Sequence, residues 1–158
     1  MSRRQILPAS GIALAAVALF LVALWSPARQ VRLHQEGLLD AISDRDWKRL
    51  GPFIADDYSD RWGHDKANVL EAAGIAFGQF VFLKVTLHDP AVSVTGEAGR
   101  VVSRVVVGGK GGPLAEAVVA VADGLREPFT FDWQQRSWKP WDWALVRMEQ
   151  RELEIPEM

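Results

Sequence analysis

An uninterrupted apolar segment near the amino terminus limits what this chain can be. No charged residue occurs between Gln5 and Ala28, and positions 6–25 are dominated by Ile, Leu, Ala, Val and Phe. At about 1.5 Å per residue, those positions would form a helix about 30 Å long, which matches the hydrocarbon core of a bilayer. We therefore expect the chain to contact a membrane through residues 6–25.

A cleaved secretory signal is the alternative, because a short basic start followed by an apolar run also describes a signal peptide. Ser26 and Ala28 occupy the positions of a small-x-small cleavage site. Pro27 lies between them, the apolar run is long for a signal peptide, and Trp25 suits a membrane interface. We expect residues 1–28 to be an uncleaved transmembrane anchor, with cleavage as the open alternative.

Two opposing features bear on the orientation of the anchor. The basic residues just beyond the apolar segment outnumber those before it: Arg29, Arg32, Arg45, Lys48 and Arg49 against Arg3 and Arg4. Charge counting alone would place the domain in the cytoplasm. However, a short tail before a first apolar helix is typical of a signal anchor, and large domains cross membranes largely regardless of charge. We expect a single-pass protein whose domain is extracytoplasmic, in the periplasm.

The remainder of the chain has the composition of one globular domain. The 158 residues are 49% hydrophobic and 24% charged, which provides for a core but leaves no length for a second domain. There are 18 Lys and Arg, of which Arg3 and Arg4 precede the apolar segment, against 20 Asp and Glu. The domain is therefore net acidic and lacks the basic footprint of a nucleic-acid-binding protein. The absence of cysteine excludes disulfides, thiolate metal sites and cysteine nucleophiles.

Three helices are expected after the anchor. Ser26 and Pro27 are typical of an N-cap followed by proline in the first helical position, a short second helix follows Asp44 or Asp46, and a third begins near Asp65. Apolar residues at helical spacing support each of these helices and are expected to face the core. They are Val31, Leu38, Leu39 and Ile42 in the first helix; Trp47, Leu50, Phe53 and Ile54 in the second; and Val69, Ala73, Ala76, Phe77 and Phe80 in the third.

After Phe80 the hydrophobic period changes from helix to strand. Positions 83–88 alternate apolar and polar residues, Asp89-Pro90 is expected to break that strand before "AVSVT" resumes it, and "GRVVSRVVV" forms the next strand. We interpret "GGKGG" as a flexible loop and "PLAEAVVAVADGL" as a helix, with a strand as the alternative for the latter. "EPFTFDW", a turn at "QQRS" and "WKPWDWALVRM" complete a carboxy-terminal hairpin. Helices followed by antiparallel strands predict an α+β fold.

Two segments resemble the nuclear-transport-factor-2-like (NTF2-like) superfamily. "AISDRDWKRLGPFIADDYSDRWG" is similar to its passage from the first helix to the second, and "FTFDWQQRSWKPWDWALVRMEQRELEIP" is similar to its last two strands. The resemblance implies three amino-terminal helices packed on a strongly curved antiparallel sheet, a cone, over residues 29–150, with residues 151–158 as a tail. The longer "GGKGG" passage and the apolar segment depart from the pattern. The superfamily includes ketosteroid isomerase, scytalone dehydratase and polyketide cyclases as well as binding and assembly domains, so fold alone leaves function open.

The stretch "DDYSDRWGHD" at positions 56–65 concentrates groups that an active site would use. The candidates for the mouth of the cavity that the resemblance implies are Asp57, Tyr58, Trp62 and His64. An isomerase or dehydratase would need a general base, from this stretch or His88, facing an oxyanion donor such as the Tyr58 hydroxyl. In the simpler interpretation, which we favour, the aspartates are turn and capping residues and the aromatic side chains belong to the core.

No pattern in the sequence predicts a metal or a cofactor. His34, His64 and His88 share no short ligand spacing, and "GGKGG" lacks the spacing and the following Ser or Thr of a P-loop. Neither a G-x-S-x-G nucleophile motif nor a dinucleotide-binding fingerprint occurs. We expect no metal site and no cofactor.

Four tryptophans crowd the carboxy-terminal hairpin: Trp133, Trp138, Trp141 and Trp143. Because side chains alternate along a strand, Trp138 cannot face the core together with Trp141 and Trp143 unless a bulge intervenes near Pro140. Aromatic residues in excess of what a core needs mark binding surfaces, so Trp138 and Trp141 are candidate interface residues. The alternative is that all four fill the concave sheet.

The sequence therefore predicts a membrane-anchored, non-catalytic binding or assembly domain, with a protein partner or a homodimer possible. One anchor followed by one such domain resembles inner-membrane components of bacterial secretion machines. The alternative is a periplasmic cavity enzyme of isomerase, dehydratase or cyclase type that acts on a small apolar substrate. A cone filled with apolar side chains would favour assembly, whereas an open pocket with a carboxylate or histidine at its floor would favour catalysis.

Overall fold

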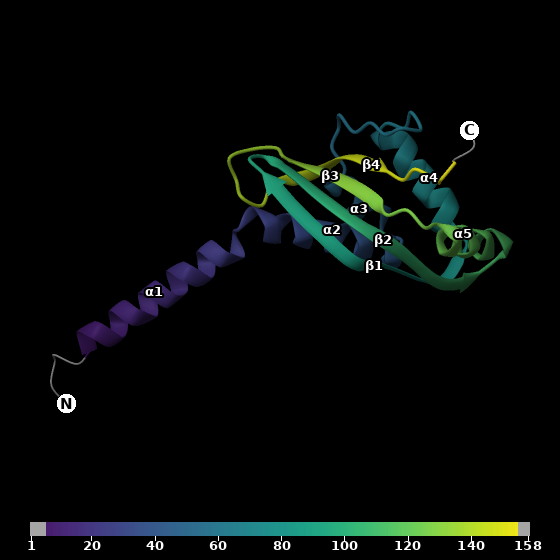
Figure 1. The fold of residues 1–158 in the computed structure, drawn as a ribbon. Coiled ribbons are helices and arrows are strands. Elements are labelled where there is room, and N and C mark those ends of the chain that lie inside the picture. The colour runs from purple at the N-terminus through teal and green to yellow at the C-terminus, as the bar shows by residue number, and fades with distance from the viewer. Residues whose placement is uncertain (1–5, 155–158) are drawn as a thin grey trace.

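The computed structural model describes residues 6–154, with side chains from residue 11 onward (Figure 1). Arg3, Arg4 and positions 155–158 of the expected tail lie outside the described residues. The elements are α1 (Ile6–Leu24), α2 (Pro27–Asp44), α3 (Trp47–Leu50), the 3-10 helix η1 (Gly51–Phe53), α4 (Lys66–Gly78), β1 (Phe80–Thr95), β2 (Ala98–Gly111), α5 (Pro113–Gly124), β3 (Phe129–Gln135) and β4 (Trp143–Glu149). Five α-helices and a four-stranded antiparallel sheet confirm the expected α+β class.

Helix α1 projects away from the rest of the molecule (Figure 1). Its side chains from Gly11 to Ala23 are all exposed. Within the described residues, no single helix has both the length and the apolar composition of a membrane span. The part of α1 from Gly11 to Leu24 meets those criteria only when it is taken together with α2, across a bend of 56°.

Helix α2 begins where the Ser26-Pro27 pair predicted it. Ser26 is the N-cap and Pro27 the first helical residue, although the Ser26 side chain makes no capping hydrogen bond. Instead the Gln30 side-chain amide donates to the Leu24 carbonyl over 2.9 Å and so satisfies one of the free carbonyls at the end of α1. The two helices are therefore joined directly.

The apolar stripe of α2 packs against the sheet as predicted. Val31, Leu38 and Leu39 are buried, and the helix lies against β1 and β2. It ends at Asp44, and the next residue, Arg45, has its backbone in the left-handed region at φ 55°. The Arg45 guanidinium donates to the Phe80 carbonyl at the start of β1. Asp46 then caps α3 by accepting from the Arg49 backbone N–H over 3.0 Å.

Helix α3 and η1 carry the chain to the far edge of the sheet. Leu50 is buried in the core. Trp47, which the sequence analysis expected in the core, is half-buried and packs against its edge. Ile54 forms an isolated parallel bridge with Leu145 of β4, and the Ala55 N–H donates to the Leu145 carbonyl over 2.9 Å.

Helix α4 begins after Asp65, which caps it by accepting from the Asn68 N–H over 2.9 Å. None of its residues is fully buried, and it packs mainly on α3 and α5. Phe80, which the sequence analysis assigned to this helix, is instead the buried first residue of β1. The position of Phe80 fits the apolar spacing of the helix before it and of the strand after it. Its pairing with Gly111 across the sheet assigns it to β1.

The sheet has the order β1-β2-β3-β4, so β1 lies at one edge. Strand β1 is continuous through Asp89-Pro90, where the sequence analysis expected a break. The pairing register shifts between His88 and Ala91, and Asp89 adopts a positive φ of 53°. The buried Ser103 of β2 donates its hydroxyl to the His88 carbonyl over 2.9 Å at this bulge. The proline is therefore accommodated by a bulge at a sheet edge.

The predicted flexible loop "GGKGG" is mostly strand. Gly108 to Gly111 continue β2 and pair with the first residues of β1. A Cβ on Gly111 would collide with the Gln79 carbonyl, and one on Gly109 would collide with the Phe82 carbonyl. The glycines therefore allow close backbone approach, and the loop interpretation was wrong.

Helix α5 follows with Pro113 in its first turn, which favours the helix over the strand alternative for this segment. Ala115 is buried against Gly111, and the helix packs on β2. The hairpin β3–β4 then closes the domain, but β4 begins only at Trp143. The loop covers residues 136–142 and so includes positions 138–142, which were predicted as the first part of the last strand, whereas Gln134 and Gln135 of the predicted turn belong to β3.

Candidate functional site

The stretch at positions 56–65 folds around one buried carboxyl group. Asp60 is 7% exposed, and its Oδ1 accepts the backbone N–H groups of Trp62 and His64 over 3.0 and 2.9 Å. Its Oδ2 accepts the Tyr58 hydroxyl over 3.1 Å and lies 3.2 Å from His64 Nδ1. The carboxyl group thus holds its own loop in place, as aspartates in turns commonly do.

Tyr58 is committed to this network. Its side chain is buried, and its hydroxyl donates to Asp60. Burial is the main cause that raises the Tyr58 pKa far above its usual value, and the neighbouring Asp60 raises it further. The phenol is therefore a neutral donor whose proton is already engaged.

The other two candidates in this stretch point elsewhere. Trp62 is half-buried, and its indole N–H donates to the Leu153 carbonyl over 2.9 Å near the end of the described chain. Asp57 is exposed and forms an ion pair with Arg136 over 3.1 Å. Of the four pocket candidates, only Tyr58 and His64 bring their side chains together, and they do so at Asp60.

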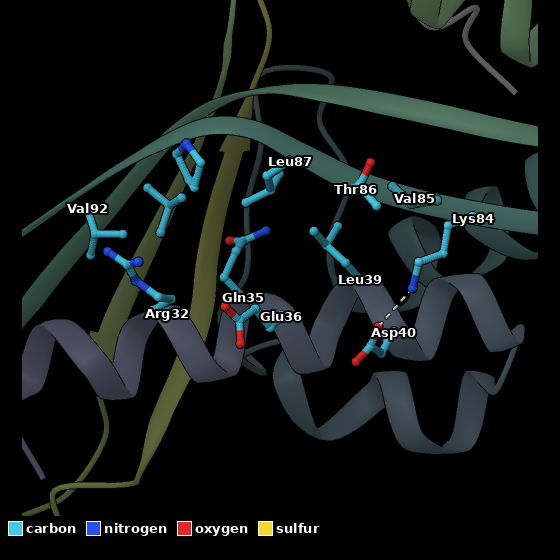
Figure 2. Close-up of a pocket in the computed structure, with 12 residues that line it drawn as sticks. Arg32, Gln35, Glu36, Leu39, Asp40, Lys84, Val85, Thr86, Leu87 and Val92 are labelled. Atoms are coloured by element: carbon cyan, nitrogen blue, oxygen red, sulfur yellow. Dashed lines mark hydrogen bonds and ion pairs between the residues drawn. The ribbon is translucent and has the colours of Figure 1, made fainter. Parts of the chain in front are cut away.

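A groove lies elsewhere, between α2 and the edge strand β1 (Figure 2). Its volume is about 320 Å³. The lining residues are Arg32, Gln35, Glu36, Leu39, Asp40, Lys84, Val85, Thr86, Leu87, Pro90, Val92 and Val101. None of the candidates from positions 56–65 is among them.

The groove has an apolar interior and a charged rim. Leu39, Val85 and Val101 are buried, whereas Arg32 and Glu36 are exposed. At one end of the groove, Lys84 lies 3.5 Å from Asp40 across the opening, and both side chains are about half exposed (Figure 2). The charged groups of this groove therefore stand in solvent, where an ion pair contributes little to stability.

Gln35 is the one buried polar residue in the groove lining. It is 1% exposed and points from α2 toward the sheet (Figure 2). Its Oε1 accepts the Trp133 indole N–H over 3.0 Å, while its Nε2 has no hydrogen-bond partner in the described chain. A buried amide whose N–H groups make no hydrogen bond lowers the stability of the fold, and an acceptor atom within reach of Nε2 would offset that loss.

The sequence analysis missed Gln35 because it counted only apolar residues on α2. The signal was present, since Gln35 lies four residues after Val31 and four before Leu39 and thus belongs to the buried face. A polar residue in a buried stripe is the more informative observation.

The histidines are dispersed through the described structure. His34 packs its ring on Phe53 and Trp133, with centroids 6.0 Å from each, and its Nδ1 lies 2.8 Å from the Gln30 carbonyl. His88 is exposed on β1 beside Asp89. Within residues 6–154, no three His, Asp or Glu side chains gather closely enough to hold a metal ion.

The hairpin tryptophans divide into two pairs. Trp133 and Trp143 are 1% and 3% exposed, whereas Trp138 and Trp141 are 85% and 51% exposed. The exposed pair lies in the loop between β3 and β4, where strand alternation does not apply. Both proposed interface residues are thus accessible in this structure.

Comparison with solved structures identifies the fold. A putative dehydratase from the NTF2-like family of Streptomyces avermitilis is 19% identical, with a TM-score of 0.58 over 77% of this chain and 91% of its own. The CaMKII hub of S. rosetta is 22% identical, with a TM-score of 0.54 over 78% of this chain and 94% of its own. Bd1075 of Bdellovibrio bacteriovorus is 11% identical, with a TM-score of 0.58 over 77% of this chain, which spans 38% of that protein.

No family model matches the sequence, and no curated protein is significantly similar to it. Two further NTF2-like proteins, from Pseudomonas putida and Cytophaga hutchinsonii, share the fold. The domain therefore has an NTF2-like fold, as the resemblance of its sequence implied. At these identities the likeness establishes the fold and assigns no residue a role.

Proposed function

We propose that this protein is a membrane-anchored, extracytoplasmic binding domain that does not catalyse a reaction. The groove between α2 and β1 is its binding site, and its ligand is a small, mainly apolar molecule that carries one acceptor oxygen. The observation that carries the proposal is the unpartnered Gln35 amide inside that groove.

The chemistry of the groove supports binding over catalysis. A carboxamide can donate hydrogen bonds, but it neither takes nor gives up a proton near neutral pH. The buried part of the groove lining contains no histidine or carboxyl group, and the rim carboxylates of Glu36 and Asp40 are exposed. A general base in water has no environment that would tune it for proton transfer.

The size and polarity of the groove define the ligand class. A volume of about 320 Å³ is at the small end of ligand pockets. Apolar contact with Leu39, Val85 and Val101 would bind a hydrocarbon portion, and Gln35 Nε2 would donate to a carbonyl or carboxylate oxygen. Arg32 at the rim favours an anionic group, so a short fatty acid fits this description.

The anchor is the second part of the proposal. The uncharged run of the sequence that contains α1 extends from Gln5 to Ala28, beyond both ends of the helix, and a run of that length can cross a bilayer core. Every described side chain from Gly11 to Ala23 is exposed, and none in the helix is charged. An apolar helix that covers no protein surface requires an apolar surrounding, which a bilayer provides.

A cavity enzyme is the alternative function. Its support is the open groove and the similarity of the fold to a putative dehydratase. In that case Glu36 or Asp40 at the rim would act as the base. Assembly into oligomers is compatible with either function, and the likeness to a CaMKII hub supports it.

Binding is tested by selective ¹⁵N labelling of glutamine in the full chain, held in lipid nanodiscs and titrated with octanoate. The Gln35 side-chain NH₂ signal, assigned by its loss in Gln35→Met, should shift on addition of octanoate. The matched control Gln134→Met alters a half-buried glutamine on β3 and should leave that shift unchanged. If no Gln35 shift occurs at saturating octanoate, the proposed ligand class is wrong.

Anchoring is tested separately by alkaline carbonate extraction of membranes from expressing cells. The full chain should stay in the membrane pellet, as an integral protein does. Release into the supernatant, or a mature amino terminus near Arg29 by mass spectrometry, would contradict the anchor without bearing on the groove.

A further inference from the structure

The tryptophans of this protein differ in what their indole N–H groups contact. Three of the seven donate to an acceptor within the protein: Trp62 to the Leu153 carbonyl, Trp133 to Gln35 Oε1 and Trp143 to the Pro140 carbonyl, over 2.9, 3.0 and 2.9 Å. All three are buried or half-buried. This is the usual state of a tryptophan that belongs to a folded core.

Three of the remaining four have the opposite character; the fourth, Trp47, is half-buried against the core. Trp25, Trp138 and Trp141 are 44%, 85% and 51% exposed, and their N–H groups donate to no acceptor in the described part of the chain. Each presents an apolar ring with a free donor. That combination suits a boundary between an apolar phase and water.

These three residues gather at one end of the domain. The loop between β3 and β4 reaches the junction of α1 and α2 (Figure 1), where the Trp25 and Trp141 ring centroids lie 6.3 Å apart. Trp138 lies three residues earlier in the same loop. The exposed aromatic residues are therefore continuous with the end of the apolar helix α1.

The loop that carries Trp138 and Trp141 is held in shape by hydrogen bonds. The Arg136 N–H donates to the Asp142 carbonyl over 2.7 Å, and the Asp142 N–H donates to the Lys139 carbonyl over 3.1 Å. The Gln135 side chain donates to the same Lys139 carbonyl over 2.9 Å. The exposure of the two tryptophans is thus imposed by a structured loop.

We propose that the loop at residues 136–142 rests on the lipid surface as a second membrane contact. Trp138 and Trp141 then occupy the headgroup region beside Trp25, and their N–H groups donate to lipid ester or phosphate oxygens. The inference rests on the anchor of the proposed function, because Trp25 follows α1 directly and so marks the level at which that helix leaves the bilayer core. A ring within 6.3 Å of Trp25 lies at nearly the same depth.

Charge favours a lipid surface over a protein partner at this loop. Lys139 lies between the two tryptophans, Arg29 lies in the first turn of α2 just beyond Trp25, and both are exposed. Neither makes an ion pair in the described structure. Protein surfaces that contact phospholipid headgroups commonly combine tryptophan with lysine or arginine.

The depth of each tryptophan can be measured directly. The full chain is labelled with 5-fluorotryptophan, placed in nanodiscs of phosphatidylcholine and phosphatidylglycerol, and observed by ¹⁹F NMR, with each signal assigned from a single Trp→Phe variant. A phosphatidylcholine with a nitroxide on its headgroup is then added. The signals of Trp25, Trp138 and Trp141 should lose intensity, while those of Trp133 and Trp143 serve as internal controls and should persist.

The outcomes separate this inference from the anchor. Loss at Trp25 with full intensity at Trp138 and Trp141 overturns the inference and keeps the anchor. Full intensity at all three contradicts the anchor as well. If Trp138 and Trp141 lose intensity only against a second, spin-labelled copy of the chain, the loop binds protein and the lipid assignment is wrong.

A second measurement does not depend on fluorinated side chains. The chain has no cysteine, so single nitroxides can be attached to Lys139→Cys in the loop and to Asp123→Cys at the distal end of α5. The loop nitroxide should be more accessible to oxygen, which partitions into lipid, and less accessible to a water-soluble nickel complex than the α5 nitroxide. The added change Trp138→Ser with Trp141→Ser should remove that difference, and equal accessibility in the starting protein would contradict the lipid contact.

Discussion

Two loops of this domain have similar compositions and opposite environments. The polar loop, residues 56–65, and the tryptophan loop, residues 136–142, both combine tryptophan with aspartate and basic side chains. In the polar loop the Tyr58 hydroxyl and the backbone N–H groups of Trp62 and His64 donate to the buried carboxyl group of Asp60. In the tryptophan loop the backbone makes the internal hydrogen bonds, and the Trp138 and Trp141 rings face outward.

The difference teaches where to look for function. A group whose hydrogen-bonding capacity is satisfied internally contributes to stability, and a group left without a partner is available for a ligand or a surface. By that criterion we expect the polar loop to be structural, although its composition resembles an active site. The Nε2 group of the buried Gln35 and the indole N–H groups of the exposed Trp138 and Trp141 have no partner in the described structure.

The largest expected contrast lies within the hairpin itself. Trp133→Ala should lower the free energy of unfolding by about 3–5 kcal/mol, because it removes a fully buried ring and leaves Gln35 without any partner. Trp138→Ala, in the adjacent loop, should change it by less than about 0.5 kcal/mol. Denaturant unfolding of both variants measures the contrast, and equal losses would show that Trp138 packs in the fold.

The next contrast is between two aspartates three residues apart. Asp60→Ala should lower the free energy of unfolding by about 2–3 kcal/mol, since it leaves buried N–H and hydroxyl donors without their acceptor. Asp57→Ala, which breaks an exposed ion pair with Arg136, should cost less than about 1 kcal/mol. If Asp60→Ala lowers the free energy of unfolding only slightly, Asp60 does not stabilise the polar loop as proposed.

The role of Tyr58 in the polar loop can be tested through the stability of the protein at alkaline pH. Because burial raises the Tyr58 pKa in the folded state, the unfolded chain loses this proton first. The Tyr58 contribution is therefore complete below pH about 10 and declines as the pH rises above that value. Tyr58→Phe should be less stable at neutral pH by about 1 kcal/mol but should lose less stability than the wild type between pH 9 and 11. Parallel losses in the two proteins would contradict this.

The smallest effects are expected in the cell. Complementation of a deletion strain by His64→Gln or by Asp57→Asn should be nearly complete, because neither side chain lines the groove. Loss of function in either variant at unchanged thermal stability would show that the polar loop itself takes part in function and would contradict its structural role.

Local signals predicted the boundaries of the helices well. Pro27, Asp46 and Asp65 each mark a start that depends only on neighbouring backbone groups, so no tertiary information was needed. The order of helices and strands followed from the change of period near Phe80. The resemblance added the NTF2-like fold, which the solved structures support.

The errors occurred where distant residues decide. Gly109 and Gly111 form strand because the opposing carbonyls of Phe82 and Gln79 approach closely, and no local pattern shows that approach. The start of β4 at Trp143 depends on pairing with Gln135 across the hairpin. The resemblance implied a cavity, but the residues that line the groove were not predicted, because they come together only when α2 meets the edge of the sheet, 44 residues apart in the Asp40–Lys84 pair.

The direct junction of α1 and α2 has a consequence for the length of the chain. Gln30 bonds the Leu24 carbonyl through its side chain and the Ser26 carbonyl through its backbone N–H, over 2.9 and 3.0 Å, so no slack separates the two helices. One residue inserted between Trp25 and Ser26 would add about 3.3–3.6 Å of extended chain at this junction, separate the Leu24 carbonyl from the Gln30 side chain and displace Trp25 from Trp141. The number of residues between the two helices thus sets the position of Trp25 against the domain.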